Sequence, residues 1–270
     1  MKQPLDANQY AYLVKLAAFA ATTTALVLVV LKLYAWLATD ASAMLASATD
    51  SILDLFASIM NAVILRFALA PADQEHKFGH GKAESLAGLV QVAFVLGSAF
   101  LLMMNGVDRV ITPKAIVQTE VGVWVSVIAI FFTLGLVFIQ KYVIAKTQSL
   151  AISADSLHYQ SDLILNLGVL AALLLSQDYW PRADGIFTVL VGAYLLYGAV
   201  KIVWLSVQHL MDHELSVEEV NKIKAIVAAH DNALGLHDLR TRQAGQQRFI
   251  QFHLELDDTL TLLAAHSIGE

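Results

Sequence analysis

Two pairs of metal-binding residue types stand inside long apolar stretches of this sequence. Asp50 and Asp54 are four residues apart, and so are His158 and Asp162. Residues at this spacing lie on one face of an α-helix, so each pair would present two ligands one turn apart. A carboxylate at the centre of a bilayer costs about 2.5–3.5 kcal/mol on insertion scales, which indicates a purpose or a partner. We therefore predict one site of three carboxylates and one imidazole, a set that suits a divalent transition metal such as Zn²⁺.

A polar segment between two apolar stretches holds a second set of possible ligands. In residues 70–82, Asp73, His76 and His80 have the spacing D-x2-H-x3-H, and the neighbouring glycines would let the segment fold back on itself. Loops of this composition are more often simply solvated. From the residues alone, a metal site and a solvated loop both remain open.

Three histidines in the last 60 residues form the third set. His237 and His253 fall on two strands expected to be neighbours, and His266 falls on the helix expected after them. Strict alternation places His253 on the polar face of its strand, where it is available as a ligand. Surface histidines without a ligand role are an equally open interpretation.

The elements that must position these residues follow from hydropathy. The 270 residues are 57% hydrophobic and 15% charged, with a mean hydropathy of +0.62. Soluble domains average roughly 45–50% apolar and about 25% charged residues. A membrane-spanning helix needs about 20 predominantly apolar residues. We predict six transmembrane helices, over about 12–37, 41–69, 83–110, 117–145, 148–176 and 183–210.

These helices would make an all-α membrane domain over residues 1–210. Residues 211–270 hold 15 of the 40 charged side chains and are expected to form a small α/β domain, incomplete at its C-terminal end by at least one strand. Its expected elements are a helix over Val217–Ala229 with a Ser216/Glu219 capping box, strands over His237–Gln243 and Arg248–Leu256 around an Ala244-Gly245 turn, and a helix from near Thr259.

Composition and charge exclude several classes of protein. The absence of cysteine excludes disulfides, thiolate zinc sites and cysteine nucleophiles. A net charge of −6 gives no support to a nucleic-acid partner. The bias of lysine and arginine toward one side of the predicted spans places both termini in the cytoplasm. The cations on that side are Arg66, Lys77, Lys82, Lys141 and Lys146, against Arg109, Lys114 and Arg182 on the other.

Other polar residues in the predicted spans have simpler interpretations. Asp155 shares a helix face with His158 and Asp162 but lies nearer the cytoplasmic end, so we expect it at the mouth of the site and not among the ligands. Lone amides within spans usually hydrogen-bond a neighbouring helix, and this is expected of Asn61, Asn105 and Asn166.

Several motifs resemble those of the cation diffusion facilitator family, and the resemblance covers essentially the whole chain. It implies six transmembrane helices and a ferredoxin-like cytoplasmic domain, assembled as a homodimer in the bacterial inner membrane. It also implies that the protein exchanges divalent metal for protons. The motifs are Leu45-Ala-Ser-Ala-Thr-Asp-Ser-Ile-Leu-Asp54, Pro71-Ala-Asp73, Phe78-Gly-His-Gly-Lys-Ala-Glu-Ser85, Ala154-Asp-Ser-Leu-His-Tyr-Gln-Ser-Asp162 and His237-Asp-Leu-Arg-Thr-Arg-Gln243.

The resemblance also implies a role for individual residues. The third site it implies is incomplete here, because the family's domain ends in a further strand with a His and an Asp ligand. The implied sets are a transport site of Asp50, Asp54, His158 and Asp162, a loop site of Asp73, His76 and His80, a cytoplasmic site with His237, His253 and His266, and an ion pair of Lys82 with Asp212 where two dimer halves would pivot.

The chemistry of such a site favours exchange. Metal ligands must be deprotonated, so binding of Zn²⁺ expels protons and protonation expels Zn²⁺. We expect a secondary transporter that exports Zn²⁺ by alternating access, with Cd²⁺ and Fe²⁺ as further substrates and without an organic cofactor. The alternatives are an intramembrane metalloenzyme, whose usual H-E-x-x-H motif is absent from the sequence, and a passive divalent-cation channel.

Overall fold

The computed structural model describes residues 6–40, 42–112, 120–174 and 183–269. Lys114 and Arg182, which enter the charge bias across the predicted spans, lie outside the described residues, as do positions 41, 117–119 and 175–176 at the ends of the expected helices. The chain divides into two compact units, Met1–Ser206 and Val207–Glu270.

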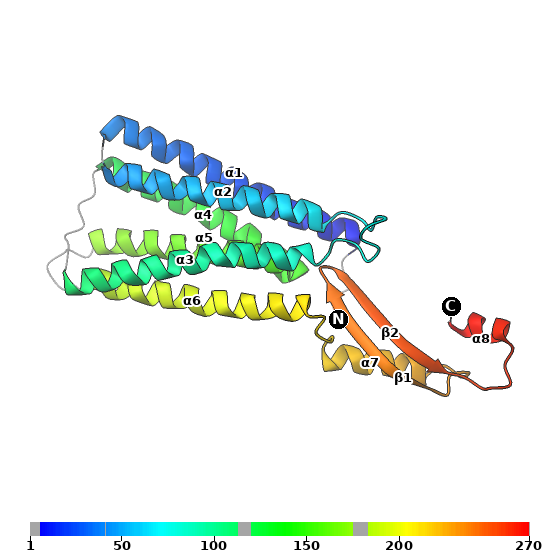
Figure 1. Cartoon of the computed structure of the whole chain (residues 1–270). Coiled ribbons are helices and arrows are strands. Elements are labelled where there is room, and N and C mark those ends of the chain that lie inside the picture. The colour runs from blue at the N-terminus through cyan, green and yellow to red at the C-terminus, as the bar shows by residue number, and fades with distance from the viewer. Residues whose placement is uncertain (1–5, 41, 113–119, 175–182, 270) are drawn as a thin grey trace. The chain divides into compact units, whose positions relative to one another are not determined.

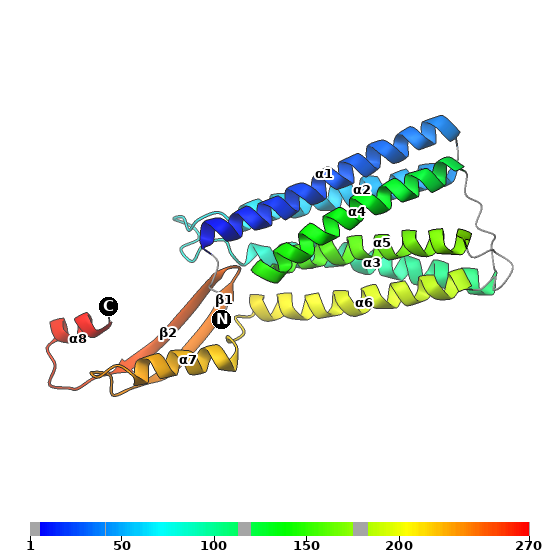
Figure 2. The ribbon, with the colours of Figure 1, turned by 180° about the vertical axis from the view of Figure 1, so that it is seen from behind.

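Long helices run side by side in the first unit (Figure 1 and, from behind, Figure 2). Each coincides with one of the six predicted stretches, and the bounds agree to within five residues. The helices are α1 (Ala7–Thr39), α2 (Ser42–Ala68), α3 (Ala83–Ile111), α4 (Glu120–Thr147), α5 (Leu150–Leu174) and α6 (Ala183–Leu210).

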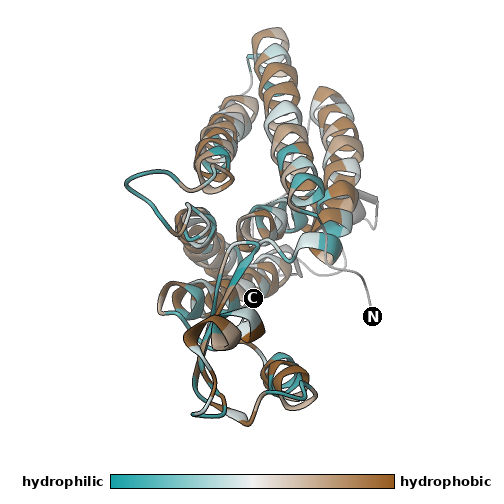
Figure 3. Cartoon of the chain, turned by 90° about the vertical axis from the view of Figure 1, so that its right-hand side faces the viewer, coloured by the Kyte–Doolittle hydropathy of each residue, from teal (hydrophilic) through white to brown (hydrophobic). Residues whose placement is uncertain are grey.

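The outer surfaces of these helices carry large apolar side chains. Phe19, Phe131 and Phe138 are each more than 70% exposed, and apolar residues run along most of each helix (Figure 3). Contiguous apolar surface on this scale is typical of contact with lipid. Among the described residues, α1, α2, α3, α4 and α6 are long and apolar enough to cross a membrane. The chain is therefore a multi-pass membrane protein.

Helix α5 differs from the other five, because polar residues interrupt its apolar sequence. It lies beside α3 and α4, and its residues Ala151, Ile152 and Ala154 are completely buried. This burial explains how α5 tolerates carboxylates and an imidazole, since its polar residues face neighbouring helices. α1 in turn lies beside α2 and α4, and α2 lies beside α3.

Small residues let α3 and α6 approach closely. A Cβ added at Gly106 would lie 2.9 Å from the carbonyl oxygen of Gly185, and one added at Gly185 would lie 2.8 Å from the carbonyl oxygen of Gly106. Such contacts between glycines are a common basis of helix packing in membranes. Helices α3, α5 and α6 share one buried cluster, which includes Val92, Ala154 and Leu195.

Two of the three asparagines do not bond a neighbouring helix as predicted. Asn105 donates to the carbonyl of Leu101, and Asn166 donates to the carbonyl of Asp162, each one turn back on its own helix. An amide that reaches its own backbone needs no partner helix, so those two predictions were wrong. The buried Asn61 Oδ1 has no hydrogen-bond partner among the described residues.

The second unit contains α7 (Val217–Ala228), the antiparallel strands β1 (Gly235–Ala244) and β2 (Gln247–Glu255), and α8 (Leu262–Gly269). The predicted cap is confirmed, since the Glu219 N–H donates to Ser216 Oγ at 3.4 Å. Gly245 opens the turn between the strands with a φ of 58°, which favours glycine. A bulge interrupts the pairing between His237 and Arg240.

Candidate functional site

The first candidate site is built on α2 and α5. Helix α5 begins directly after α4, and Ser149 caps it by accepting a hydrogen bond from the Ile152 N–H at 3.3 Å. Farther along, the buried Tyr159 shares a 3.0 Å hydrogen bond with Ser58 of α2. This contact holds the two helices together one turn from Asp54, and so positions the α2 carboxylate against α5.

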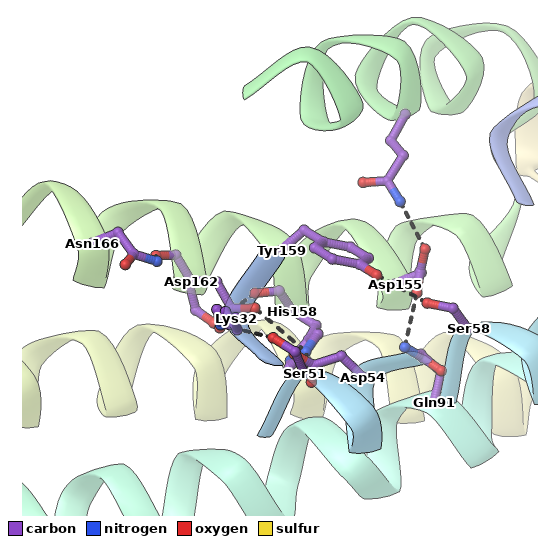
Figure 4. Close-up of polar contacts among 12 residues, drawn as sticks. Lys32, Ser51, Asp54, Ser58, Gln91, Asp155, His158, Tyr159, Asp162 and Asn166 are labelled. Carbon is purple, nitrogen blue, oxygen red and sulfur yellow. Dashed lines mark hydrogen bonds and ion pairs between the residues drawn. The ribbon is translucent and has the colours of Figure 1, made fainter. Parts of the chain in front are cut away.

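Three of the four residues predicted for this site meet, and we call Asp54, His158 and Asp162 the deep cluster. One ligand atom from each lies within 4.8 Å of the others. His158 Nε2 is 2.8 Å from Asp54 Oδ1 and 3.5 Å from Asp162 Oδ2. Figure 4 shows the side chains converging from the two helices. The i, i+4 spacing on α5 and the neighbouring α2 carboxylate therefore produce one compact set of two acids and an imidazole.

The fourth predicted ligand, Asp50, lies one turn before Asp54 and is exposed. Its oxygens are not among the atoms that lie within 4.8 Å of one another in the deep cluster. It still interacts electrostatically with Asp54 and with Lys32 of α1. Asp50 thus adds negative charge beside the deep cluster without contacting His158 in this conformation.

The two nitrogens of His158 have different surroundings. Nε2 faces both carboxylates, whereas Nδ1 is buried without a hydrogen-bond partner among the described residues. A 2.8 Å contact between a ring nitrogen and a carboxylate oxygen requires a proton between them or a cation in its place. Nε2 is therefore the atom at which a proton and a metal ion would compete.

The position of Asp155 differs from the prediction. It is completely buried and does not lie at a mouth. Gln91 of α3 donates to its Oδ1 at 2.9 Å, and Gln140 of α4 donates to its Oδ2 at 2.7 Å. A carboxylate can remain buried when amide donors satisfy its oxygens. Asp155 therefore joins three helices, and neither glutamine was identified from the sequence.

Lys32 was also missed by the sequence analysis. It stands in the apolar run of α1, and its Nζ donates to Ser51 Oγ of α2 at 2.7 Å (Figure 4). Ser51 is 1% exposed and lies between Asp50 and Asp54 in the sequence. A lysine within the apolar run of a predicted span was the available signal, because intramembrane charges are costly.

The second candidate site lies in the segment between α2 and α3, where Asp73, His76 and His80 form what we call the loop cluster. Its ligand atoms also lie within 4.8 Å of one another. Asp73 Oδ1 is 3.4 Å from His76 Nδ1, and its Oδ2 is 3.4 Å from His80 Nε2. Gly79, with a φ of 77°, turns the chain so that the two histidines face each other.

Hydrogen bonds orient the side chains of the loop cluster. The His80 Nδ1–H donates to the carbonyl of Pro71 at 3.1 Å, which leaves the lone pair of Nε2 directed at Asp73. The backbone N–H of His76 donates to the Asp73 carboxylate and, with smaller contributions, lowers its pKa below the ordinary value. A lone pair and an ionised carboxylate that face each other repel unless a proton or cation lies between them.

The second unit brings two of the three predicted histidines together. His237 and His253 are paired across β1 and β2, and His253 Nδ1 lies 3.3 Å from His237 Nε2. Glu255 lies on the same face two residues after His253, and its Oε1 is 2.8 Å from His237 Nδ1. Among the described residues, His266 does not join them in a set of ligand atoms within 4.8 Å.

The predicted ion pair between Lys82 and Asp212 would join residues of different units and stays a prediction. Within the second unit, Asp212 accepts a hydrogen bond from Arg242 at 3.3 Å. Arg242 also lies over the Phe249 ring, with its Cζ 4.6 Å from the centroid.

Carboxylates and an imidazole gathered between apolar membrane helices are typical of proteins that move ions or protons across a membrane. The chain belongs to the cation efflux family: residues 18–211 match the cation efflux transmembrane domain, and residues 215–270 match the cation efflux protein cytoplasmic domain. This is a family of transporters and not of enzymes.

Similar proteins come from several bacteria. The cation-efflux pump FieF of Shewanella oneidensis is 51% identical over 97% of this chain and 89% of its own length. The proteins of the same name from Yersinia enterocolitica and Klebsiella pneumoniae are both 47% identical over 97% of this chain, and the matches cover 87% and 88% of their lengths.

Proposed function

We propose that the protein is a divalent metal/proton antiporter that exports Zn²⁺ from the cytoplasm by alternating access. The observation that carries this proposal is the position of His158 Nε2, 2.8 Å from Asp54 and 3.5 Å from Asp162. The same nitrogen would hold a proton between the carboxylates in one state and Zn²⁺ in the other. Because both cannot occupy it at once, loading of metal releases a proton.

The transport site in this proposal comprises the deep cluster together with Asp50, which approaches the metal when it binds. Three carboxylates can each coordinate through one oxygen or two, so the site can also accept ions that prefer more ligands than Zn²⁺ does. In the absence of thiolates, geometry and not softness selects the metal. We therefore infer that Cd²⁺ and Fe²⁺ are carried as well as Zn²⁺.

The proposal includes the arrangement of the chain in the membrane. α5 spans the membrane together with the other five long helices, since it lies beside the spans α3 and α4. Residues 1–210 form the transmembrane domain, and residues 211–270 form a ferredoxin-like cytoplasmic domain through which two copies dimerise. The protein lies in the bacterial inner membrane with both termini in the cytoplasm. His237, His253 and His266 contribute to a cytoplasmic metal site, and Lys82 pairs with Asp212 at the dimer pivot.

Proteoliposomes test the antiport. Purified protein is reconstituted with a fluorescent zinc indicator inside the vesicles, and an imposed pH gradient, acidic inside, is expected to drive Zn²⁺ uptake that stops when a protonophore collapses the gradient. Uptake of Cd²⁺ and Fe²⁺ in the same vesicles tests the substrate range. Zinc flux that ignores the proton gradient would identify a passive channel and contradict the proposal.

The loop cluster tunes transport in this proposal and does not carry the ion across. His80→Ala is therefore expected to slow zinc uptake, while the zinc affinity of the deep cluster stays within about threefold of wild type because well-separated sites couple weakly. Uptake rates and calorimetric titration measure the two effects. Glu75→Ala, in the same loop but outside the cluster, is the matched control. An equally severe loss of deep-cluster affinity in His80→Ala would overturn this role.

A further inference from the structure

The deep cluster lies beside a cation that belongs to the protein. Lys32 stands seven residues before the end of α1, about 10 Å of helix from that end. A lysine placed for snorkelling would extend its ammonium toward water. Instead, Nζ donates to Ser51 Oγ at 2.7 Å, and Ser51 is almost completely buried. The charge of Lys32 is therefore held at α2, next to the site.

The ammonium interacts with the acids on both sides of the site. Lys32 interacts electrostatically with Asp50 of α2 and with Asp162 of α5, and Figure 4 shows it next to Ser51 and Asp162. It forms no hydrogen bond with a carboxylate in the part of the chain that the structure describes. The carboxylates thus remain available to an ion, while their combined negative charge is reduced by one.

The charges balance for one class of ion. Asp50, Asp54 and Asp162 contribute three negative charges, and Lys32 contributes one positive charge. With His158 neutral, a divalent cation brings the charge of these four side chains to zero, whereas a monovalent cation leaves it negative. Asp155 is not counted with them, because Gln91 and Gln140 donate hydrogen bonds to both of its oxygens. Because net charge is expensive where the dielectric constant is low, neutrality favours divalent ions. The same ammonium repels the bound ion and lowers the affinity enough to permit release.

We propose that Lys32 is a charge-balancing residue of the transport site, which selects divalent ions and weakens their binding so that they are released. This inference rests on the proposed function. It assigns Lys32 a role through charge and not through shape, because within the described part of the chain its ammonium donates to a serine hydroxyl and forms no hydrogen bond or ion pair with a carboxylate of the site.

Substitutions that separate charge from shape test the inference. In Lys32→Met, which keeps the length of the side chain and removes its charge, zinc binding to the purified protein is expected to tighten by at least about tenfold, since the repulsion between like charges is gone. Zinc uptake by proteoliposomes should slow as release becomes limiting. Lys32→Arg retains the charge and should bind zinc within about threefold of wild type. Lys201→Met, at an exposed position of α6, is the matched control.

Zinc affinity is measured with a competing chelator. All variants are made in a parent protein that lacks the loop cluster (Asp73→Ala, His76→Ala, His80→Ala), and the part of zinc binding that Asp162→Ala removes is assigned to the deep cluster. Weaker or unchanged zinc binding in Lys32→Met overturns the inference. Weaker binding would mean that Lys32 holds α1 and α2 together for structural reasons, and unchanged binding would mean that its charge does not act on the site. Failure of the proposed function itself gives a different result: the parent protein would then show no component that depends on Asp162.

Discussion

Replacement of Asp162 with alanine is expected to abolish zinc transport and to weaken zinc binding at the deep cluster by at least about 100-fold. Loss of groups that merely support metal ligands already costs about 10–100-fold in affinity, so loss of a ligand should cost more. The structure places Asp162 Oδ2 3.5 Å from His158 Nε2, one turn away on the same helix. Calorimetric titration and vesicle uptake measure the two losses.

The folded state of this variant should survive, because the substitution removes a charge that the membrane disfavours. Asp162→Ala should therefore insert into membranes, keep the oligomeric state of wild type and unfold in detergent as wild type does. Asn166→Ala is the matched control, since Asn166 lies one turn farther along α5 and donates only to the backbone carbonyl of Asp162. If both variants lost zinc binding equally, or if only Asp162→Ala unfolded, Asp162 would be a structural residue and not a ligand.

The second large effect concerns stability. Gln140→Leu is expected to destabilise the helix bundle by about 1.5–3 kcal/mol, the usual contribution of a hydrogen bond to a charged group. The amide of Gln140 donates to Asp155 Oδ2 at 2.7 Å, and Asp155 is completely buried. Without this donor, one oxygen of a buried carboxylate loses its partner. Thermal unfolding of the purified protein in detergent measures the change.

A combined variant distinguishes a hydrogen-bond network from simple loss of packing. Gln91→Leu, Gln140→Leu and Asp155→Leu together replace the whole polar group with apolar side chains of similar volume, and such complete replacements can be nearly neutral. The triple variant should therefore recover most of the stability that Gln140→Leu loses. If the destabilisations of the single variants simply added, the three residues would be independent and the network would not exist.

Hydropathy and residue spacing by themselves determine the helices of this protein and most of its candidate site residues. The bounds of α1 to α6 are a matter of apolar length, and the cap of α7 is a local Ser–Glu pattern. The pairs Asp50/Asp54 and His158/Asp162 are visible in the sequence because i, i+4 spacing is a property of a single helix. The loop cluster is also visible in the sequence, because its three candidate ligands lie within eight consecutive residues.

Contacts between helices are beyond the reach of such patterns. Lys32, Gln91 and Gln140 each hydrogen-bond a residue of another helix, and no local spacing indicates which faces of α1, α3 and α4 turn toward α2 and α5. For the same reason Asp155, expected at a mouth, is instead the buried junction of three helices. A helix fixes the direction of a side chain only relative to its own axis. The rotation and neighbours of each axis come from packing of the whole bundle, and only the tertiary structure decides them.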